Sequence, residues 1–229
     1  MKITQAARMQ GIERTLIRQI FDSAPAEAIN LGLGQPDLPT PAALSLSGIS
    51  GICSGKTGYT STAGDPSLRA AIAEHYAPFA AGPDDVAVTV GSQEAMFASC
   101  LSLVDPGCEI LYPDPGYPAY PVVASLIGPR GVPYRLRAAD RFRIDPAEIA
   151  GRITERTRLV IICEPSNPTG AISDPHALQE LAELLDARGV PWISDEIYSG
   201  FTYEREFHSI SRLAPRGGLV IGGLSKDLS

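Results

Sequence analysis

The chain has 229 residues, and its 44% hydrophobic and 20% charged residues are ordinary for a globular protein that buries a sizeable core. Acidic residues exceed basic residues by 26 to 19, so the net charge is −7, and neither nucleic acid nor an acidic membrane surface is an expected partner. The four cysteines lack CxxC spacing and the three histidines do not cluster with them, so we expect no disulfide framework and no metal site. No apolar run reaches membrane-spanning length and no signal-peptide pattern opens the chain, which predicts a cytoplasmic protein.

The N-terminal part of the chain differs in pattern from the rest. Apolar residues recur with helical spacing through residues 5–21, and an extended segment that breaks in a Gly/Pro turn follows over residues 29–37. Residues 56–60 have the composition of a loop. We therefore divide the chain into an N-terminal arm and substrate-side segment, residues 1–55, and a sheet domain, residues 56–229.

From residue 86 onward, predicted strands alternate with predicted helices. Short apolar runs predict the strands Val86–Val90, Glu109–Tyr112, Val132–Arg137, Leu159–Cys163, Pro191–Ser194 and Leu219–Leu224. Capping and breaking residues predict a helix that Asp65 caps and Pro66 opens, one that Ser92 caps, one over residues 119–127, and one from Pro175 to Gly189. This alternation favours an α/β fold whose mostly parallel sheet has helices on both faces.

Polar motifs follow several of these strands at their carboxyl ends. In open α/β sheets ligands bind at that edge, so the motifs are expected to lie close together. Each motif alone is typical of a turn or a helix cap, but so many on one edge are hard to attribute to turn chemistry. They are Gly91-Ser92-Gln93, Gly116-Tyr117, Asn167 to Gly170, Asp195 to Tyr198, and Ser225-Lys226.

Two of these motifs offer an anion site and an amine. Ser92 and Gln93 stand at the start of a predicted helix, whose backbone N–H groups and dipole favour a phosphate. Lys226 follows a buried strand and a Gly-Gly turn, where desolvation favours the neutral, nucleophilic amine.

The remaining motifs supply partners for an aromatic ring. Asp195 can hold a protonated ring nitrogen, Tyr198 and Asn167 can hydrogen-bond a ring oxygen, and Tyr117 offers an aromatic face for stacking. A phosphate, a ring nitrogen, a ring oxygen and an aldehyde for the lysine together describe pyridoxal 5′-phosphate.

A longer set of motifs occurs along the chain in one order: Leu33-Gly34-Gln35-Pro36-Asp37, Tyr59-Thr60 with Gly64, Gly91-Ser92-Gln93-Glu94-Ala95, Asp114-Pro115-Gly116-Tyr117-Pro118, Ser166-Asn167-Pro168-Thr169-Gly170, Ser194-Asp195-Glu196-Ile197-Tyr198 and Ser225-Lys226. In order and approximate spacing this set resembles the class I/II aminotransferases of the aspartate aminotransferase superfamily. The resemblance covers nearly the whole chain and implies the large domain of the pyridoxal-phosphate enzymes of fold type I. It also implies a biosynthetic transferase that acts on an amino acid and a 2-oxo acid.

The resemblance implies roles for the residues that would surround the cofactor ring. Lys226 would form the internal aldimine and then move the proton between the substrate α-carbon and the cofactor. Asp195 would keep the ring nitrogen protonated, and Tyr198 and Asn167 would hold the ring oxygen.

Further roles concern the phosphate, the substrate and a second subunit. By resemblance, Ser92 and Gln93 would bind the phosphate, Tyr117 would stack on the ring, and Gly34, together with Asn167, would approach the substrate. Tyr59 matches a position that reaches the phosphate of the neighbouring subunit in family dimers, so a homodimer is expected.

The chain departs from the family pattern around its lysine. Gly223 stands where the family often has a phosphate-binding serine, so that contact is missing or comes from Ser225. The arginines that pair with the phosphate and with the substrate carboxylate have no counterpart before Ser229, and neither have the next strand and the C-terminal small domain. We therefore expect a fragment of a longer enzyme or a truncated product.

Two other functions remain open on this sequence. One is a carbon–sulfur lyase or a related lyase or synthase on the same scaffold, because the large-domain motifs are shared. The other is a truncated, non-catalytic pyridoxal-phosphate-binding protein or regulatory module. Regulators of that kind carry an N-terminal helix-turn-helix, for which residues 1–28 are too short.

Overall fold

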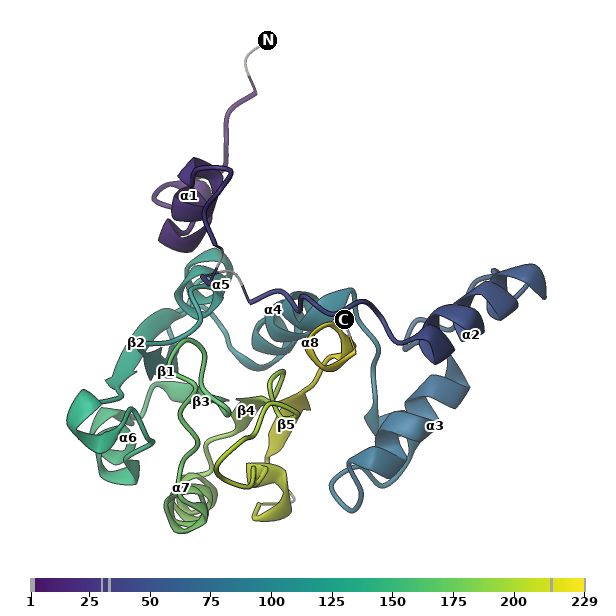
Figure 1. Cartoon of the computed structure of the whole chain (residues 1–229). Coiled ribbons are helices and arrows are strands. Elements are labelled where there is room, and N and C mark those ends of the chain that lie inside the picture. Colours follow the sequence, from purple (N-terminus) through teal and green to yellow (C-terminus); the bar gives the residue numbers. More distant parts are fainter. Residues whose placement is uncertain (1–2, 30, 33, 215, 229) are drawn as a thin grey trace.

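The computed structural model describes residues 3–29, 31–32, 34–214 and 216–228. Its centre is a five-stranded sheet with the order β2-β1-β3-β4-β5, and every neighbouring pair is parallel (Figure 1). The strands are β1 Glu109–Asp114, β2 Arg130–Arg135, β3 Thr157–Cys163, β4 Trp192–Asp195 and β5 Gly218–Ile221. The predicted α/β fold with a mostly parallel sheet is confirmed.

Helices cover both faces of this sheet. The α-helices are α1 Leu16–Ser23, α2 Ala42–Cys53, α3 Pro66–His75, α4 Gly91–Leu103, α5 Ala119–Ile127, α6 Pro146–Arg152, α7 Pro175–Arg188 and α8 Leu224–Asp227. Short 3₁₀ helices are η1 Ala7–Met9, η2 Pro83–Asp85, η3 Ala138–Asp140 and η4 Ile210–Arg212. Figure 1 shows α4 and α5 on one side of the sheet and α6 and α7 on the other.

Side-chain alternation along the strands divides the core into two layers. Leu159 and Ile161 of β3 pack with residues of α4 and α5, whereas Val160 and Ile162 pack with residues of α6 and α7. These β3 residues are all 0% exposed, because helices cover the central strand on both sides. Burial on both faces explains why the strand is an uninterrupted apolar run.

The strand predictions were correct for β1, β3 and β4 to within two residues, but Val86–Val90 is wrong. The Val88 N–H donates to the Ala63 carbonyl at 2.9 Å, yet no strand of the described ranges pairs with this segment, and Val90 is 88% exposed. A strand needs a partner for its ladder, and an apolar pattern alone does not supply one. The strand predicted as Val132–Arg137 begins and ends two residues earlier, as β2.

The C-terminal strand and the helix at Ser92 also differ from their predictions. The strand predicted as Leu219–Leu224 ends at Ile221, because the chain leaves the sheet at the two glycines and Leu224 begins α8. Ser92 is not the N-cap of α4: the helix begins at Gly91, whose φ is 76°, and Val90 precedes it. The Glu94 carboxylate, rather than Ser92, accepts the Val90 N–H.

The other helix predictions had mixed outcomes. Asp65 caps α3 as predicted, its carboxylate accepting the Ser67 N–H at 2.9 Å, and Gly189 ends α7 with a φ of 59°. Residues 5–21 are only partly helical, because Gly11 takes a φ of 83° between η1 and α1. Three α-helices were not predicted: α2, whose serines and glycines blur any apolar stripe, α6, although its Asp145-Pro146 start repeats the signal seen at α3, and the short α8.

The four cysteines are free, and among the described residues no group of His, Cys, Asp and Glu is arranged to hold a metal ion. None of the helices in the described ranges combines the length and the apolar composition that crossing a membrane requires.

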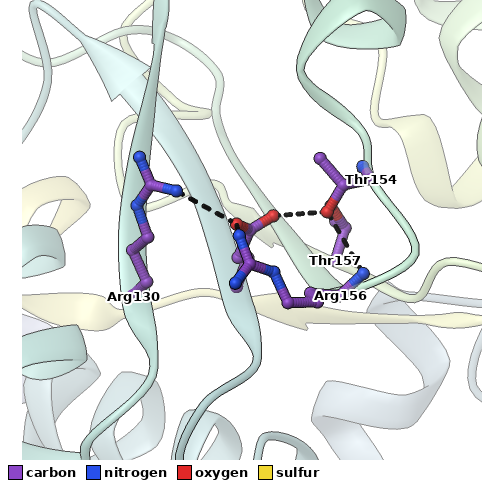
Figure 2. Close-up of polar contacts among 5 residues, drawn as sticks. Arg130, Thr154, Arg156 and Thr157 are labelled. Atoms are coloured by element: carbon purple, nitrogen blue, oxygen red, sulfur yellow. Dashed lines mark hydrogen bonds and ion pairs between the residues drawn. The ribbon is translucent and has the colours of Figure 1, made fainter.

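A buried glutamate joins three segments at the amino ends of the strands (Figure 2). The Glu109 carboxylate accepts hydrogen bonds from Thr154 Oγ1 at 2.6 Å, from Arg156 Nη2 at 2.8 Å and from Arg130 Nη1 at 3.4 Å. Only 2% of its side chain is exposed, whereas the two arginines are 62% and 69% exposed. Glu109 therefore fixes β1, β2 and the turn before β3 relative to one another at the edge opposite the polar motifs.

We predict that Glu109→Gln lowers the free energy of unfolding by about 1–2 kcal/mol, because the neutral amide loses the charge-assisted hydrogen bonds of the carboxylate. The loss stays this small because the two arginines are exposed and solvent screens their charges. Urea denaturation checks this. Asp84→Asn is the control, because the Asp84 carboxylate that pairs with Arg69 is fully exposed, at 101%. An equal loss of stability in both variants would contradict a special role for the buried network.

Candidate active site

The predicted site residues gather at the carboxyl edge of the sheet because all strands point the same way. Asp195 ends β4, and Lys226 lies in α8 directly beyond β5. Asn167 lies in the loop after β3, and Tyr117 lies between β1 and α5. Ser92 and Gln93 form the first turn of α4. Only the parallel arrangement brings residues so distant in sequence to one edge.

A cavity of about 420 Å³ opens at this edge, within the usual size range of small-molecule sites. Four of the predicted site residues line it: Ser92, Gln93, Tyr117 and Asp195. Apolar side chains of α4 and α5, among them Phe97 and Val123, form much of the remaining wall. A mostly apolar cavity with a few polar groups suits a planar ring that carries polar substituents.

Asp195 is the buried carboxylate of the cavity, with 6% of the residue exposed. The Tyr120 hydroxyl donates to its Oδ2 at 2.7 Å, and the Ile197 N–H donates to its Oδ1 at 3.4 Å. Burial raises the pKa of the Asp195 carboxyl, whereas the two hydrogen bonds lower it. A cationic group that enters the cavity beside Asp195 would replace lost solvation and favour the ionised carboxylate.

Sequence reasoning missed Tyr120, the hydrogen-bond partner of Asp195. Tyr120 is 1% exposed and, with Val123 and Ala124, forms the buried face of α5. A tyrosine on the apolar face of a helix needs a buried partner for its hydroxyl, and this signal was available in the sequence. The identity of the partner was not, because 75 residues separate Tyr120 from Asp195.

Two polar side chains are joined at the mouth of the cavity. The Gln93 side-chain amide donates to the Tyr117 hydroxyl at 2.7 Å, which couples the first turn of α4 to the aromatic ring. The Tyr117 ring also meets the Tyr120 ring edge to face, with centroids 5.7 Å apart. These contacts fix the ring plane of Tyr117 beside the cavity.

Lys226 meets the N-terminal segment across the edge of the sheet. Its Nζ donates to the Gly34 carbonyl oxygen and lies 5.8 Å from the centroid of the Tyr198 ring. A Cβ added to Gly34 would lie 3.4 Å from the Tyr198 hydroxyl and 4.0 Å from Lys226 Nζ. The structure therefore brings Gly34, Tyr198 and Lys226 together, while Leu33 of the same motif lies outside the described residues.

The turn before Lys226 is packed too closely for a side chain. A Cβ at Gly223 would overlap Cδ1 of Ile197, and a Cβ at Gly222 would overlap the Tyr76 hydroxyl. A serine at position 223 would therefore require Ile197 to move. This packing is a physical reason for the glycine at this position.

Tyr198 and Asn167 lie half-buried in the loops that follow β4 and β3. Burial raises the pKa of the Tyr198 phenol, and the neighbouring Cys163, Asp195 and Tyr117 add to the shift. The phenol therefore stays protonated at neutral pH and can donate a hydrogen bond. The Asn167 backbone N–H donates to Cys163 Sγ at 3.4 Å, which anchors its loop to the end of β3.

The other six predicted site residues do not line this cavity: Gly34, Asn167, Tyr198 and Lys226 lie at the same edge of the sheet, and Tyr59 and Ser225 are exposed. Tyr59 is fully exposed, at 109%, in the loop between α2 and α3. Ser225 is exposed in α8 and is not part of the cavity wall. The predicted phosphate contacts of Tyr59 and Ser225 therefore stay predictions.

Comparisons with known proteins agree with this geometry. The family model for aminotransferase class I and II matches residues 26–229. The putative aminotransferase YugH of Bacillus subtilis is 36% identical over 228 residues, which cover 95% of this chain and 58% of that protein. An aspartate aminotransferase of Pyrococcus horikoshii is 32% identical over 230 residues, which cover 98% of this chain and 59% of that protein.

A solved structure is similar over the whole described fold. Aspartate aminotransferase from Thermus thermophilus with maleate has a TM-score of 0.94 at 29% sequence identity, covering 99% of this chain and 62% of that one. The chain therefore spans less than two thirds of the length of the relatives that it matches. Since the family model covers nearly the whole sequence, this chain belongs to the class I and II aminotransferases, a family whose members use pyridoxal 5′-phosphate.

Proposed function

We propose that the protein is a pyridoxal-phosphate-dependent aminotransferase that moves an amino group between an amino acid and a 2-oxo acid. The observation that carries this proposal is the buried Asp195 carboxylate, which Tyr120 holds in the wall of a cavity at the same sheet edge as the Lys226 amine. A desolvated carboxylate without a cation favours a protonated ring nitrogen as its partner.

The residues around the cavity fit the other groups of the cofactor. The N–H groups of the first turn of α4, at Ser92 and Gln93, suit the phosphate. Tyr117, held by Gln93, suits the ring face. When bound, the cofactor supplies an aldehyde that joins to amines and a ring that withdraws electrons from the substrate α-carbon.

Lys226 and Tyr198 would act on the reacting side of the ring. Lys226 would hold the cofactor through its amine and would carry the proton to and from the substrate α-carbon. Tyr198, protonated at neutral pH, would donate to the ring oxygen, and Asn167 would supply a second donor there. Gly34, whose backbone meets Lys226 Nζ, leaves room for the substrate carboxylate.

We also propose that the protein works as a homodimer in the cytoplasm, with residues 1–55 as an arm between subunits and residues 56–229 as the cofactor-binding domain. None of the residues of α2 is buried, and Leu46, Ile49 and Ile52 of that helix are 56–69% exposed. Such an apolar surface is typical of an interface. In a dimer, Tyr59 would reach the phosphate of the second site, as it does not reach the cavity of its own chain.

We predict that Lys226→Ala abolishes the visible absorbance band that pyridoxal phosphate gives when a protein lysine binds it, because Lys226 is the lysine that follows β5 at this edge. Lys56→Ala is the matched control, since Lys56 is an exposed lysine in a loop and its loss should leave the band unchanged. Absence of the band from the wild-type chain at saturating cofactor contradicts the cofactor assignment.

A second experiment distinguishes an aminotransferase from a lyase by adding amino acids to the wild type. An aminotransferase yields the pyridoxamine form and one 2-oxo acid per site, whereas a lyase releases ammonia and leaves the band.

We predict that Tyr120→Phe weakens cofactor binding about tenfold, because Asp195 loses one charge-assisted hydrogen bond. This bond lowers the pKa of Asp195, so its loss raises that pKa and the affinity should fall first at acidic pH. Absorbance titration between acidic and neutral pH measures both effects. Tyr134→Phe is the control: Tyr134 is equally buried but donates to the Ile161 carbonyl at 2.9 Å, and its loss should change stability without changing affinity.

We predict that Ile49→Asp converts dimers into monomers, because a buried carboxylate in an apolar interface is strongly unfavourable. Sedimentation velocity measures the change, and circular dichroism verifies that the fold persists. His176→Asp, which alters an exposed residue of α7 on the opposite side of the sheet, should leave the dimer intact. A wild-type chain that sediments as a monomer at all concentrations would contradict the proposed dimer.

A further inference from the structure

Two buried glutamates follow the strands that carry the site. Cys163 and Asp195 face each other in the register of β3 and β4, and Glu164 and Glu196 come next on each strand. The Glu164 N–H donates to the Asp195 carbonyl at 3.1 Å, and the Glu196 N–H donates to the Ile221 carbonyl at 2.9 Å, so the ladder continues through both residues. Since side chains alternate, the glutamates occupy the sheet face opposite that of Cys163 and Asp195.

Glu164 closes the loop that carries Asn167. Its carboxylate accepts the Ser173 hydroxyl at 2.5 Å and the Ser173 N–H at 3.0 Å, which joins the first residue of the loop to its last. The Ser173 hydroxyl in turn accepts the Ile144 N–H at 3.0 Å. Between these ends, the Ser166 N–H donates to the Ala171 carbonyl at 2.9 Å. The Glu164 carboxylate therefore holds the two ends of loop 164–173 together through Ser173.

Glu196 makes a similar closure around Tyr198. Its Oε1 accepts the Ser209 hydroxyl at 2.6 Å, and Ser209 Oγ lies 2.7 Å from Ser211 Oγ. These bonds join the end of β4 to the start of η4. The segment between Glu196 and Ser209 contains Tyr198, so its path is fixed at both ends.

The two carboxyls are costly to ionise together. Burial is the largest cause that raises the pKa of each to about 7, and the serine hydrogen bonds oppose it. The charge of Glu196 raises the pKa of Glu164 further. Other groups that interact electrostatically with the two carboxyls are Tyr76, Tyr134, Cys163, Asp195 and Arg212, and Arg212 is the cation among them.

We propose that Glu164 and Glu196 are a pair of positioning residues, which set the places of Asn167 and Tyr198 from the far face of the sheet. Their effect on the cofactor rests on the proposed function, whereas their effect on the two loops does not. A carboxyl whose pKa is higher in the folded state than in the unfolded state stabilises the fold fully below the unfolded value, and this stabilisation is lost as pH rises through the folded value. Both loops should therefore loosen as the pH rises from about 4.5, the ordinary pKa of a glutamic acid, to about 7, and change little at higher pH.

Hydrogen exchange on the cofactor-free chain tests this pairing at about pH 6 and about pH 8, after correction for intrinsic rates. We expect Glu164→Gln to lower the protection of segment 164–173 about tenfold at the lower pH, because the amide nitrogen does not accept the Ser173 N–H or hydroxyl. The remaining protection should no longer change with pH. In Glu196→Gln the pH-dependent change in segment 164–173 should shrink, since Glu164 no longer faces a second charge.

Ser173→Ala and Glu109→Gln complete this test. Ser173→Ala keeps the N–H bond to Glu164 and should give a smaller loss of protection in the same segment, which tests the proposal even where Glu164→Gln does not fold. Glu109→Gln replaces a glutamate equally buried at the opposite end of the sheet, and it should lower the protection of segment 164–173 by no more than its loss of global stability explains. The proposal is overturned if segment 164–173 is equally protected in the wild type, Glu164→Gln and Ser173→Ala. It is also overturned if Glu109→Gln lowers the protection of this segment as much as Glu164→Gln does.

A spectroscopic measurement connects the pair to the cofactor. Asn167 and Tyr198 are proposed to bond the ring oxygen, so Glu164→Gln should shift the pH midpoint of the bound-cofactor absorbance by about half a unit, and Glu109→Gln should not. An unshifted midpoint in Glu164→Gln contradicts the link to the ring. If the wild type gives no absorbance band, the proposed function fails, and the exchange experiment still decides whether the glutamates hold the loops.

Discussion

The candidate site depends on the burial of β3 and β4 between two helical layers. Because every strand is parallel, their carboxyl ends meet at one edge, and the last residues of these two strands are Cys163 and Asp195. The same burial deprives Asp195 of water, so that its carboxylate depends on the Tyr120 hydroxyl. A solvated aspartate at this point would have little preference for a cationic ring. Desolvation, rather than the mere presence of a carboxylate, makes the cavity selective.

Buried acids are concentrated at this edge, and neutral donors hold each of them. Asp195 accepts a hydrogen bond from the Tyr120 hydroxyl, Glu164 accepts one from the Ser173 hydroxyl, and Glu196 accepts one from the Ser209 hydroxyl. Hydroxyl donors stabilise carboxylates without neutralising them, so the pKa values of Glu164 and Glu196 stay near 7 instead of falling. Glu109, at the other edge, instead forms ion pairs with Arg130 and Arg156. At the edge with the cavity, the two glutamates therefore change their protonation near neutral pH, whereas ion pairs hold the carboxylate at the opposite edge.

The lysine is placed by contacts from both ends of the chain. Gly222 and Gly223 allow the turn after β5 to pass beneath Tyr76 and Ile197, and Lys226 then meets the Gly34 carbonyl. The chain spans about 60% of the length of its relatives, at 58% and 59% for the two sequences compared. Apolar residues of α1 and α2, among them Leu16, Ile20, Leu46 and Ile52, are exposed in this chain.

Local patterns in the sequence determined most of the elements and most of the site. The apolar run Leu159–Cys163 has no polar interruption, and this alone identified a strand buried on both faces. Asp65 and Gly189 carry the chemistry of helix ends, and the motifs around Asp195 and Lys226 are contiguous in sequence. Such signals need no knowledge of distant partners.

The tertiary structure alone decided which distant groups meet. Val86–Val90 has the pattern of a strand, but no strand among the described residues pairs with it, and Tyr120 has a hydroxyl whose acceptor lies far along the chain. Glu164 and Glu196 looked like polar residues of loops, yet both are buried directly beyond the ends of β3 and β4, where the charge of one affects the other. Ladder pairing, desolvation and electrostatic coupling all depend on distances between segments. A single sequence encodes those distances only through the fold as a whole. For this reason the sequence by itself determined which residue types form the site. The tertiary structure determined which partners they meet and in which direction their pKa values shift.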